Sequence, residues 1–270
     1  MTTTHLPPPP AAATAKKGKV SFSKPRTASG QRIVVYGPGG IGKTSLALAA
    51  PGNTVFFDLD DSLSVLPAGN DALTVSVDNW MQMRDALNSD GWDDIQNIVI
   101  DSATKAEEIA LEHTLATVKT EKGRQAKSIE DYGYGKGYSH LFETVLPLLA
   151  DLEKHTRAGR NVVLICHDCA TNCPNPMGED WLRYEPRLSS PASGKSSIRL
   201  RVREWADHML YYGYDVAVKD GKGQGSGTRT IYPTELPHCM AKSRTLNYPL
   251  AVDQPDPSLW ECIFNGVAEA

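Results

Sequence analysis

The sequence predicts an α/β fold in which helices cover both faces of a mostly parallel sheet. Three short apolar runs, at 33–36, 98–100 and 162–166, are typical of buried strands. Segments of helical character lie between them, and the first of these directly follows a glycine-rich loop. Strands that alternate with helices form parallel sheets that are covered on both faces.

The length and composition indicate one main cytoplasmic domain. The 270 residues, 40% of them hydrophobic, suffice for one good core. A formal charge of -4 excludes a uniformly basic nucleic-acid binder, so any such contact must be local. No apolar run has the roughly 18 residues of a membrane span, and the N-terminus has no signal-peptide core. The five cysteines are odd in number, so we expect reduced thiols rather than a disulfide framework.

Both ends of the chain are expected to lie outside the folded core. Residues 1–30 combine four consecutive prolines with an Ala/Thr run and short basic clusters, and have almost nothing to bury. We expect a disordered arm there, which is either a solvated tail or a tether for DNA or another partner. The core is placed at 31–250, and a C-terminal tail at 251–270.

The local patterns predict the elements of the core in order. Residues 44–50 are good helix formers, and Pro51 and Gly52 end that helix. Further helices are predicted at 80–89, 105–119 and 138–154. Further strands are predicted at 55–57, 73–77, 197–203, 210–218, 228–232 and 239–241. Residues 171–195 are polar and proline-rich, and a connection of that length is usually a functional or mobile loop.

The glycine-rich loop fits two nucleotide-binding motifs. The string GPGGIGKT, from Gly37 to Thr44, matches both the G-x-G-x-x-G dinucleotide motif and the G-x-x-x-x-G-K-[ST] phosphate loop. Both motifs need glycine because only glycine lets backbone N–H groups approach a phosphate closely. Asp58 also suits the dinucleotide motif, in which an acidic residue about 20 positions on binds the ribose. The loop by itself leaves both interpretations open.

Lys43 and Thr44 favour a nucleoside triphosphate. A triphosphate has more charge to neutralise than a dinucleotide and carries Mg²⁺, which the Lys43 ammonium and the Thr44 hydroxyl suit. Asp101 ends the apolar strand at 98–100, as in a Walker B element, and can hold Mg²⁺ through its water shell. We therefore predict ATP and Mg²⁺ as ligands. The predicted nucleotide-binding residues are Gly37, Pro38, Gly39, Gly40, Ile41, Gly42, Lys43, Thr44 and Ser45.

The order of these motifs resembles the RecA-like recombinases, and most closely the compact phage proteins that keep only the ATPase core. Those proteins promote single-strand annealing or recombination. The resemblance covers residues 32–248, and only the phosphate loop is specific by itself. It implies a RecA-like P-loop NTPase fold, with a mostly parallel central sheet flanked by helices and antiparallel strands added at the C-terminal end. For a phage-encoded protein, the compartment would be the cytoplasm of the host.

The resemblance also implies catalytic roles. Asp60 stands where the family has a glutamate that polarises the attacking water, and Asp61 or Asp58 are substitutes if the shorter side chain does not reach. His167 follows the strand at 162–166 and takes the place of the polar residue that senses the γ-phosphate. We expect both residues to act with Lys43.

The string AKSR near the end resembles an element that recombinases and hexameric helicases insert into the ATP site of the neighbouring subunit. In this chain its cations are Lys242 and Arg244, which point to the same side of an extended segment. A cation supplied by a neighbour neutralises charge on the transferred phosphoryl group, so hydrolysis depends on assembly. Two exposed basic residues near a strand end are the alternative.

Two segments resemble the DNA-binding loops of recombinases, at 121–136 and 168–196. Cations for phosphates, interleaved with aromatic rings for bases, are the composition that single-stranded DNA binding requires. The candidate contacts are Lys122, Arg124, Lys127 and Lys136 in the first segment and Trp181, Arg183, Tyr184, Arg187 and Lys195 in the second. A mobile loop or a substrate lid is the alternative, because the acidic pair Glu179-Asp180 is unhelpful to a polyanion. The predicted strand at 197–203 places three arginines on one face, where they extend the patch or face solvent.

Together these features predict an ATP-dependent single-stranded DNA-binding protein that promotes annealing or recombination. It would form homo-oligomeric rings or filaments that hydrolyse ATP at subunit boundaries, with a single-strand binding protein as a further candidate partner and no membrane contact. One alternative is a helicase-like, loader or terminase-like motor. Another is a small-molecule kinase, in which 168–196 is a substrate lid.

The cysteines and histidines around 166–173 include enough ligand types for zinc. Their spacing is loose, and Cys166 is expected to point into the sheet. Buried thiols are therefore the favoured interpretation.

Overall fold

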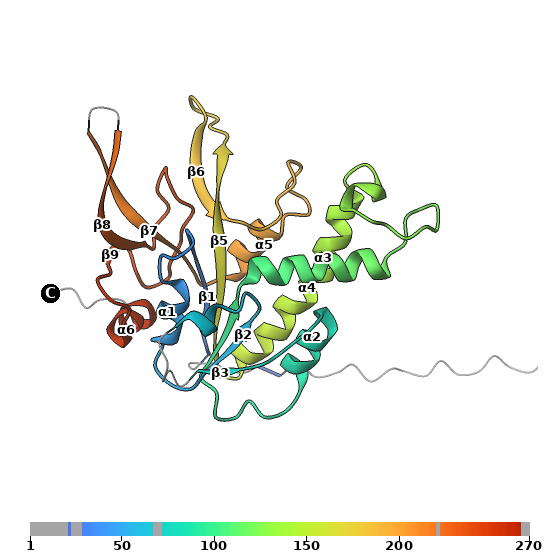
Figure 1. Ribbon diagram of the computed structural model, residues 1–270, viewed down its shortest axis with the longest axis horizontal. Coiled ribbons are helices and arrows are strands. Elements are labelled where there is room, and N and C mark those ends of the chain that lie inside the picture. Colours follow the sequence, from blue (N-terminus) through green and yellow to red (C-terminus); the bar gives the residue numbers. More distant parts are fainter. Residues whose placement is uncertain (1–20, 23–28, 67–71, 220–221, 266–270) are drawn as a thin grey trace, which may run out of the picture.

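The computed structural model describes residues 21–22, 29–66, 72–219 and 222–265. Most of the arm expected at 1–30 lies outside the described residues. The described chain forms one large sheet with helices on both faces, and two β-hairpins project from one edge of the sheet (Figure 1).

The centre of the sheet is parallel, as predicted. Its strands are β1 (Arg32–Gly37), β2 (Thr54–Asp58), β3 (Leu73–Thr74), β4 (Asn97–Asp101), β5 (Asn161–Cys173), β6 (Trp181–Pro186), β7 (His208–Lys219), β8 (Lys222–Tyr232) and β9 (Leu250–Ala251). The order across the sheet is β3-β2-β4-β5-β1-β7-β8-β9, and β6 pairs with β5. In this order across the sheet, the strands from β3 to β7 all run parallel to one another, whereas β8 and β9 are added by antiparallel pairing. Strand β6 is likewise antiparallel to β5. The predicted fold class is confirmed.

Helices cover both faces because side chains along each strand alternate between two hydrophobic clusters. The α-helices are α1 (Lys43–Leu48), α2 (Trp80–Asn88), α3 (Ala103–Thr117), α4 (Lys136–Arg157), α5 (Ile198–Trp205) and α6 (Pro257–Asn265), with 3-10 turns at Ser62–Val65 and Ile129–Tyr132. In β1, Val34 and Tyr36 pack with α2 to α5, whereas Ile33 and Val35 pack with α1 and α6. None of the helices in the described part of the chain is both long and apolar enough to cross a membrane.

The strand predicted at 197–203 is wrong, because these residues belong to α5. Ser197 begins the helix, since its side chain accepts a hydrogen bond from the Leu200 amide at 3.1 Å. Ile198, Val202 and Trp205 are buried, at the spacing of one helix face. Apolar residues four apart fit both a strand and a helix, and Trp205 lies beyond the alternating run. The arginines at 199, 201 and 203 consequently do not share one face.

The tail expected at 251–270 is also wrong over its described part. Helix α6 packs against the sheet through Trp260 and Ile263, which are both fully buried. The Trp260 indole N–H donates to the Leu46 carbonyl at 2.8 Å, which ties α6 to α1. Its nine residues are too short for a clear periodic signal.

Two further expectations about the C-terminal half change. The long loop expected at 171–195 begins as a β-hairpin, because β5 continues to Cys173 and pairs with β6 from Asp168↔Pro186 to Cys173↔Trp181. The strand expected at 239–241 is reduced to isolated bridges of Cys239 with Tyr184 and with Leu236. The hairpin replaces a mobile loop by a paired ribbon.

We predict that His208 makes the free energy of unfolding depend on pH. His208 is 1% exposed, its Nδ1 lies 2.8 Å from the Ser243 hydroxyl, and burial lowers the pKa of its imidazole to about 4. An unfolded histidine titrates near pH 6.5, so between these values only the unfolded chain takes up the proton, and stability falls as the pH falls. The loss should be about 2 kcal/mol between pH 7 and pH 5.

Urea unfolding at both pH values, with His208→Asn as the matched variant, measures this contribution. The variant keeps a polar group near Ser243 but has no titratable ring, so its stability should change less between the two pH values. Equal changes for the wild type and the variant would contradict the assignment.

Candidate nucleotide-binding site

The glycine loop forms a cradle at the carboxyl end of β1. The loop leaves β1 at Gly37 and enters α1 at Lys43. Gly40 and Gly42 have φ values of 75° and 106°, which disfavour residues with a Cβ. A Cβ added to Gly39 or Gly40 would meet no protein atom within 4 Å, so these backbone positions face open space. That open face is what a phosphate-binding loop requires, since a ligand approaches the bare backbone.

Lys43 lies inside this cradle. Its side chain donates to the carbonyls of Gly37 and Pro38 at 2.8 and 2.9 Å, and the residue is 8% exposed. Burial lowers the pKa of the Lys43 ammonium, while the nearby carboxylates of Asp168 and Asp101 act in the opposite direction. The ammonium is thus held at the loop by the loop's own carbonyls.

Thr44 and Asp101 join the loop to the end of β4. The Thr44 hydroxyl donates to the Asp101 carboxylate at 2.6 Å, and Asp101 is buried. Burial raises the pKa of Asp101 to about 6, and the hydrogen bond from Thr44 opposes that rise. A hydroxyl in contact with a carboxylate is an oxygen pair of the kind that binds Mg²⁺ with phosphate. These two residues therefore fit the predicted metal.

Asp60 and His167 face each other across the same cavity. The two side chains approach to 3.5 Å, between His167 Nε2 and Asp60 Oδ2. Strand β5 lies between β1 and β4, which places His167 beside Gly37 in the sheet. The Asp60 amide donates to the Asp101 carbonyl at 3.3 Å, so the backbone that carries Asp60 is tied to β4.

The cavity has a volume of about 460 Å³. Its lining includes Gly39, Gly40, Gly42, Lys43, Thr44, Ser45, Asp60, Asp61, Asp101 and His167. Asp58 has a different role, because its carboxylate accepts hydrogen bonds from the amides of Ser62 and Leu63. Of the two possible substitutes for Asp60, only Asp61 lines the cavity.

Lys242 and Arg244 lie at the opposite end of β1. Lys242 pairs with Met209 at the start of β7, and Arg244 contacts Asp207 at 2.8 Å. Asp207 also binds Arg32, the first residue of β1, whereas the glycine loop follows the last. The length of β1, about 16 Å at the usual rise per residue, separates the two ends. The pair therefore does not contribute to the cavity of its own chain.

The first predicted DNA segment forms a loop between α3 and α4. Lys122, Arg124 and Lys127 line a separate cavity of about 460 Å³ with the exposed ring of Tyr134. Lys136 lies at the start of α4 and pairs with Glu121. Three of the four predicted cations thus line one cavity together with Tyr132 and Tyr134.

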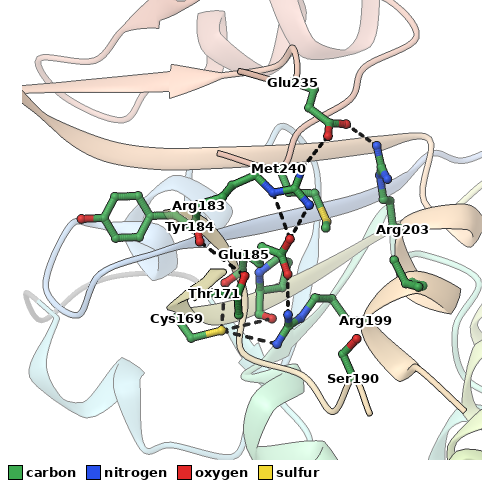
Figure 2. Close-up of polar contacts among 12 residues, drawn as sticks. Cys169, Thr171, Arg183, Tyr184, Glu185, Ser190, Arg199, Arg203, Glu235 and Met240 are labelled. Carbon is green, nitrogen blue, oxygen red and sulfur yellow. Dashed lines mark hydrogen bonds and ion pairs between the residues drawn. The ribbon is translucent and has the colours of Figure 1, made fainter. Parts of the chain in front are cut away.

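The second predicted segment separates into exposed and bound residues. Trp181, Tyr184, Arg187 and Lys195 are exposed. Arg183 instead belongs to an ion-pair network with Glu185 and Glu235, which Figure 2 shows. Figure 2 also shows that the Tyr184 side chain points away from this network.

The same network fixes the base of the hairpin. Glu185 also pairs with Arg199 of α5, and Glu235 pairs with Arg203. Burial alone would raise the pKa of the Glu185 carboxyl, but Arg183 and Arg199 hold it below its usual value. Because Arg183 and Arg199 both pair with the buried Glu185 carboxylate, they attach β6 to α5. Arg183 therefore stabilises the hairpin.

Sequence motifs did not identify Arg229, whose side chain binds a main-chain carbonyl of the glycine loop. This β8 residue donates to the Ile41 carbonyl at 3.1 Å and also to the Asp253 carbonyl. Its contact is with a main-chain atom of a residue 188 positions away, so no local pattern reports it. Arg229 therefore positions the loop without lining the cavity.

The cysteines are free thiols. Cys166 is fully buried, and burial raises the pKa of its thiol to about 12. The described residues include no group of three His, Cys, Asp or Glu side chains arranged to hold a metal ion.

Comparisons with known proteins show the family of the chain. No curated protein matches it. Among solved structures, the crystal structure of the RadB recombinase is similar with a TM-score of 0.36 and 14% identity, over 76% of this chain and 80% of that one. The AAA domain family matches residues 29–245, which include both the glycine loop and Asp101. The chain therefore belongs to the AAA domain family.

Proposed function

We propose that the protein is an Mg²⁺-dependent ATPase that binds single-stranded DNA and promotes annealing or recombination as a homo-oligomer. The observation that carries the proposal is the convergence of three groups on one cavity. These groups are the Lys43 ammonium, the Thr44–Asp101 pair and the Asp60–His167 pair. They match the needs of phosphoryl transfer, namely charge neutralisation, metal binding and orientation of water.

The phosphate-binding residues suit a triphosphate. The open backbone at Gly39 and Gly40 would receive phosphate oxygens, and Lys43 would exchange its two carbonyl partners for them. Thr44 and Asp101 would hold Mg²⁺, which neutralises charge on the β- and γ-phosphates. A dinucleotide needs neither the ammonium nor the hydroxyl–carboxylate pair.

Asp60 is the residue that would orient the attacking water. It lines the same cavity as Lys43, and its carboxylate has His167 as a neighbour at 3.5 Å. A hydrogen bond from the imidazole would fix the carboxylate and leave its second oxygen for water. Asp60 therefore suits the role of general base.

His167 connects the cavity to the β5–β6 hairpin. Its amide donates to the Thr104 hydroxyl at 3.1 Å, and its carbonyl accepts from the Arg187 amide at 2.8 Å. Arg187 directly follows β6, so a shift of His167 on nucleotide binding would move both ends of the hairpin. The hairpin carries Trp181 and Tyr184 at its surface. This geometry supports coupling between ATP and a ligand of the hairpin.

The location of Arg244 supports a role in a neighbouring subunit. It lies far from the cavity of its own chain, and its side chain is 69% exposed. Contact with Asp207 holds it at the surface, at the amino end of β1. A residue in this place can reach an ATP site only across a subunit boundary.

We predict that Lys43→Ala abolishes nucleotide binding and turnover. Removing the ammonium leaves the phosphate charge without its main protein counter-charge, so turnover should fall at least about a hundredfold. Fluorescent ATP-analogue binding and phosphate release, each with and without single-stranded DNA, measure the effect. Lys154→Ala is the matched control, since Lys154 is an exposed lysine at the end of α4. Turnover in the Lys43 variant that equals the control would refute the site.

We predict that Arg244→Ala retains nucleotide binding but loses about a thousandfold in turnover, the lower range for an arginine supplied in trans. Equimolar mixing with Lys43→Ala tests the arrangement directly. A boundary formed by the intact glycine loop of one variant and the intact Arg244 of the other should recover activity. Undiminished turnover in the Arg244 variant, or no recovery on mixing, would remove the intersubunit role.

The DNA assay separates the proposed function from its rivals. Single-stranded DNA should bind and stimulate phosphate release. Turnover that ignores DNA but responds to a metabolite would indicate a kinase, and sustained unwinding of duplexes would indicate a motor.

A further inference from the structure

A further cavity lies beside the glycine loop, between the β5–β6 and β7–β8 hairpins. Figure 1 shows both hairpins projecting from the same edge of the sheet. The cavity has a volume of about 480 Å³, and Pro38 of the glycine loop is part of its wall. The wall also includes Asp168, Tyr184, Tyr211, Tyr214, Tyr232 and His238.

Three of these tyrosines form a stack in which one pair of rings is nearly parallel and the other pair is tilted. Tyr184 and Tyr211 have ring centroids 5.3 Å apart and planes 9° apart. Tyr211 and Tyr232 follow at 6.0 Å and 29°. The stack is open at Tyr184, whose side chain points away from the ion pairs of β6 and is 42% exposed. A flat, exposed ring at the end of a stack is a surface on which another planar group can continue it.

The polar groups of the cavity favour an uncharged ligand with hydrogen-bond donors. Asp168 is the one charged residue in the described lining. His238 packs edge-on against Tyr232, at 5.0 Å and 87°, and burial lowers the pKa of its imidazole, which favours the neutral ring. With no cation in the described lining, an anion such as phosphate has no partner there.

A carboxylate can bind either a compact cation or the N–H groups of a planar base, and the ring geometry distinguishes between these two kinds of ligand. A compact cation is held by several aromatic faces that surround it. Here Tyr184 and Tyr211 lie nearly parallel, Tyr232 is tilted by 29° from Tyr211, and the stack presents one flat end at Tyr184. That arrangement suits a planar base, whose N–H groups would donate to the carboxylate of Asp168.

We propose that this cavity binds one unstacked base of single-stranded DNA, which stacks on Tyr184 and donates a hydrogen bond to Asp168. The inference rests on the proposed DNA-binding function and assigns a base site that includes β7 and β8. Of the residues that line this cavity, the sequence motifs indicate only Tyr184 of the β5–β6 hairpin as a DNA contact. The hydroxyl of Tyr36, the residue before Gly37, lies 2.6 Å from the Met240 carbonyl and 3.0 Å from the Tyr184 carbonyl. The base site and the glycine loop therefore share the end of β1.

Photocrosslinking locates the base directly. The full-length protein is mixed with Mg²⁺, a non-hydrolysable ATP analogue and a single-stranded oligonucleotide that carries 5-iodouracil, and the crosslinked peptides are identified by mass spectrometry. We expect crosslinks at Tyr184 or Tyr214. Affinity for the same oligonucleotide should fall roughly tenfold in Tyr184→Leu, which is within the range for the loss of one stacking contact. It should also fall in Tyr214→Ala, which removes another ring of the cavity lining.

The matched variants separate stacking from damage to the fold. Tyr184→Phe keeps the ring and should restore affinity, whereas Tyr184→Leu keeps only apolar bulk. Tyr248→Ala removes an exposed tyrosine outside the cavity and should bind DNA as the wild type does. Unchanged affinity in both cavity variants, with crosslinks confined to other residues such as Tyr134, would overturn the base site and leave the proposed function intact. A wild-type protein that binds no single-stranded DNA would overturn both.

Discussion

The hydrogen bond between Thr44 and Asp101 is the interaction on which the rest of the site depends. It joins the start of α1 to the end of β4, so it sets the distance between the glycine loop and the acidic strand. The bond also provides a partner for the carboxylate of Asp101, a residue that is 3% exposed. This partner matters because an ionised group without one is costly to bury. A metal held by these two residues would take the place of this bond.

The order of the strands brings the site and the β5–β6 hairpin to the same edge of the sheet. Because β5 lies between β1 and β4, His167 of β5 lies beside Gly37 of the glycine loop. Strand β5 then continues beyond the sheet into a hairpin that is anchored by Glu185 and its two arginines. The cavity at the glycine loop and the surface of the hairpin are therefore connected by one continuous strand.

The sequence predicted the central sheet and the phosphate loop because their signals are local. Apolar runs specify buried strands, and the string from Gly37 to Thr44 carries its own chemistry. The apolar residues at 197–203 fit the periodicity of a strand as well as that of a helix. The buried Trp205, which shows that the segment is a helix, lies outside this run. Arg229 and Trp260 escaped notice because each acts through a partner that is distant in the sequence. The hairpin was missed because pairing of β5 with β6 depends on register across a polar turn.

A crystal structure grown with Mg²⁺, a non-hydrolysable ATP analogue and an excess of nicotinamide dinucleotide tests the central claim most directly. We expect triphosphate density over the backbone from Gly39 to Thr44, with the ammonium of Lys43 on the phosphates and the metal at the Thr44 hydroxyl. Dinucleotide density in that cavity would contradict it. So would a triphosphate bound elsewhere, with Thr44 still bonded to Asp101.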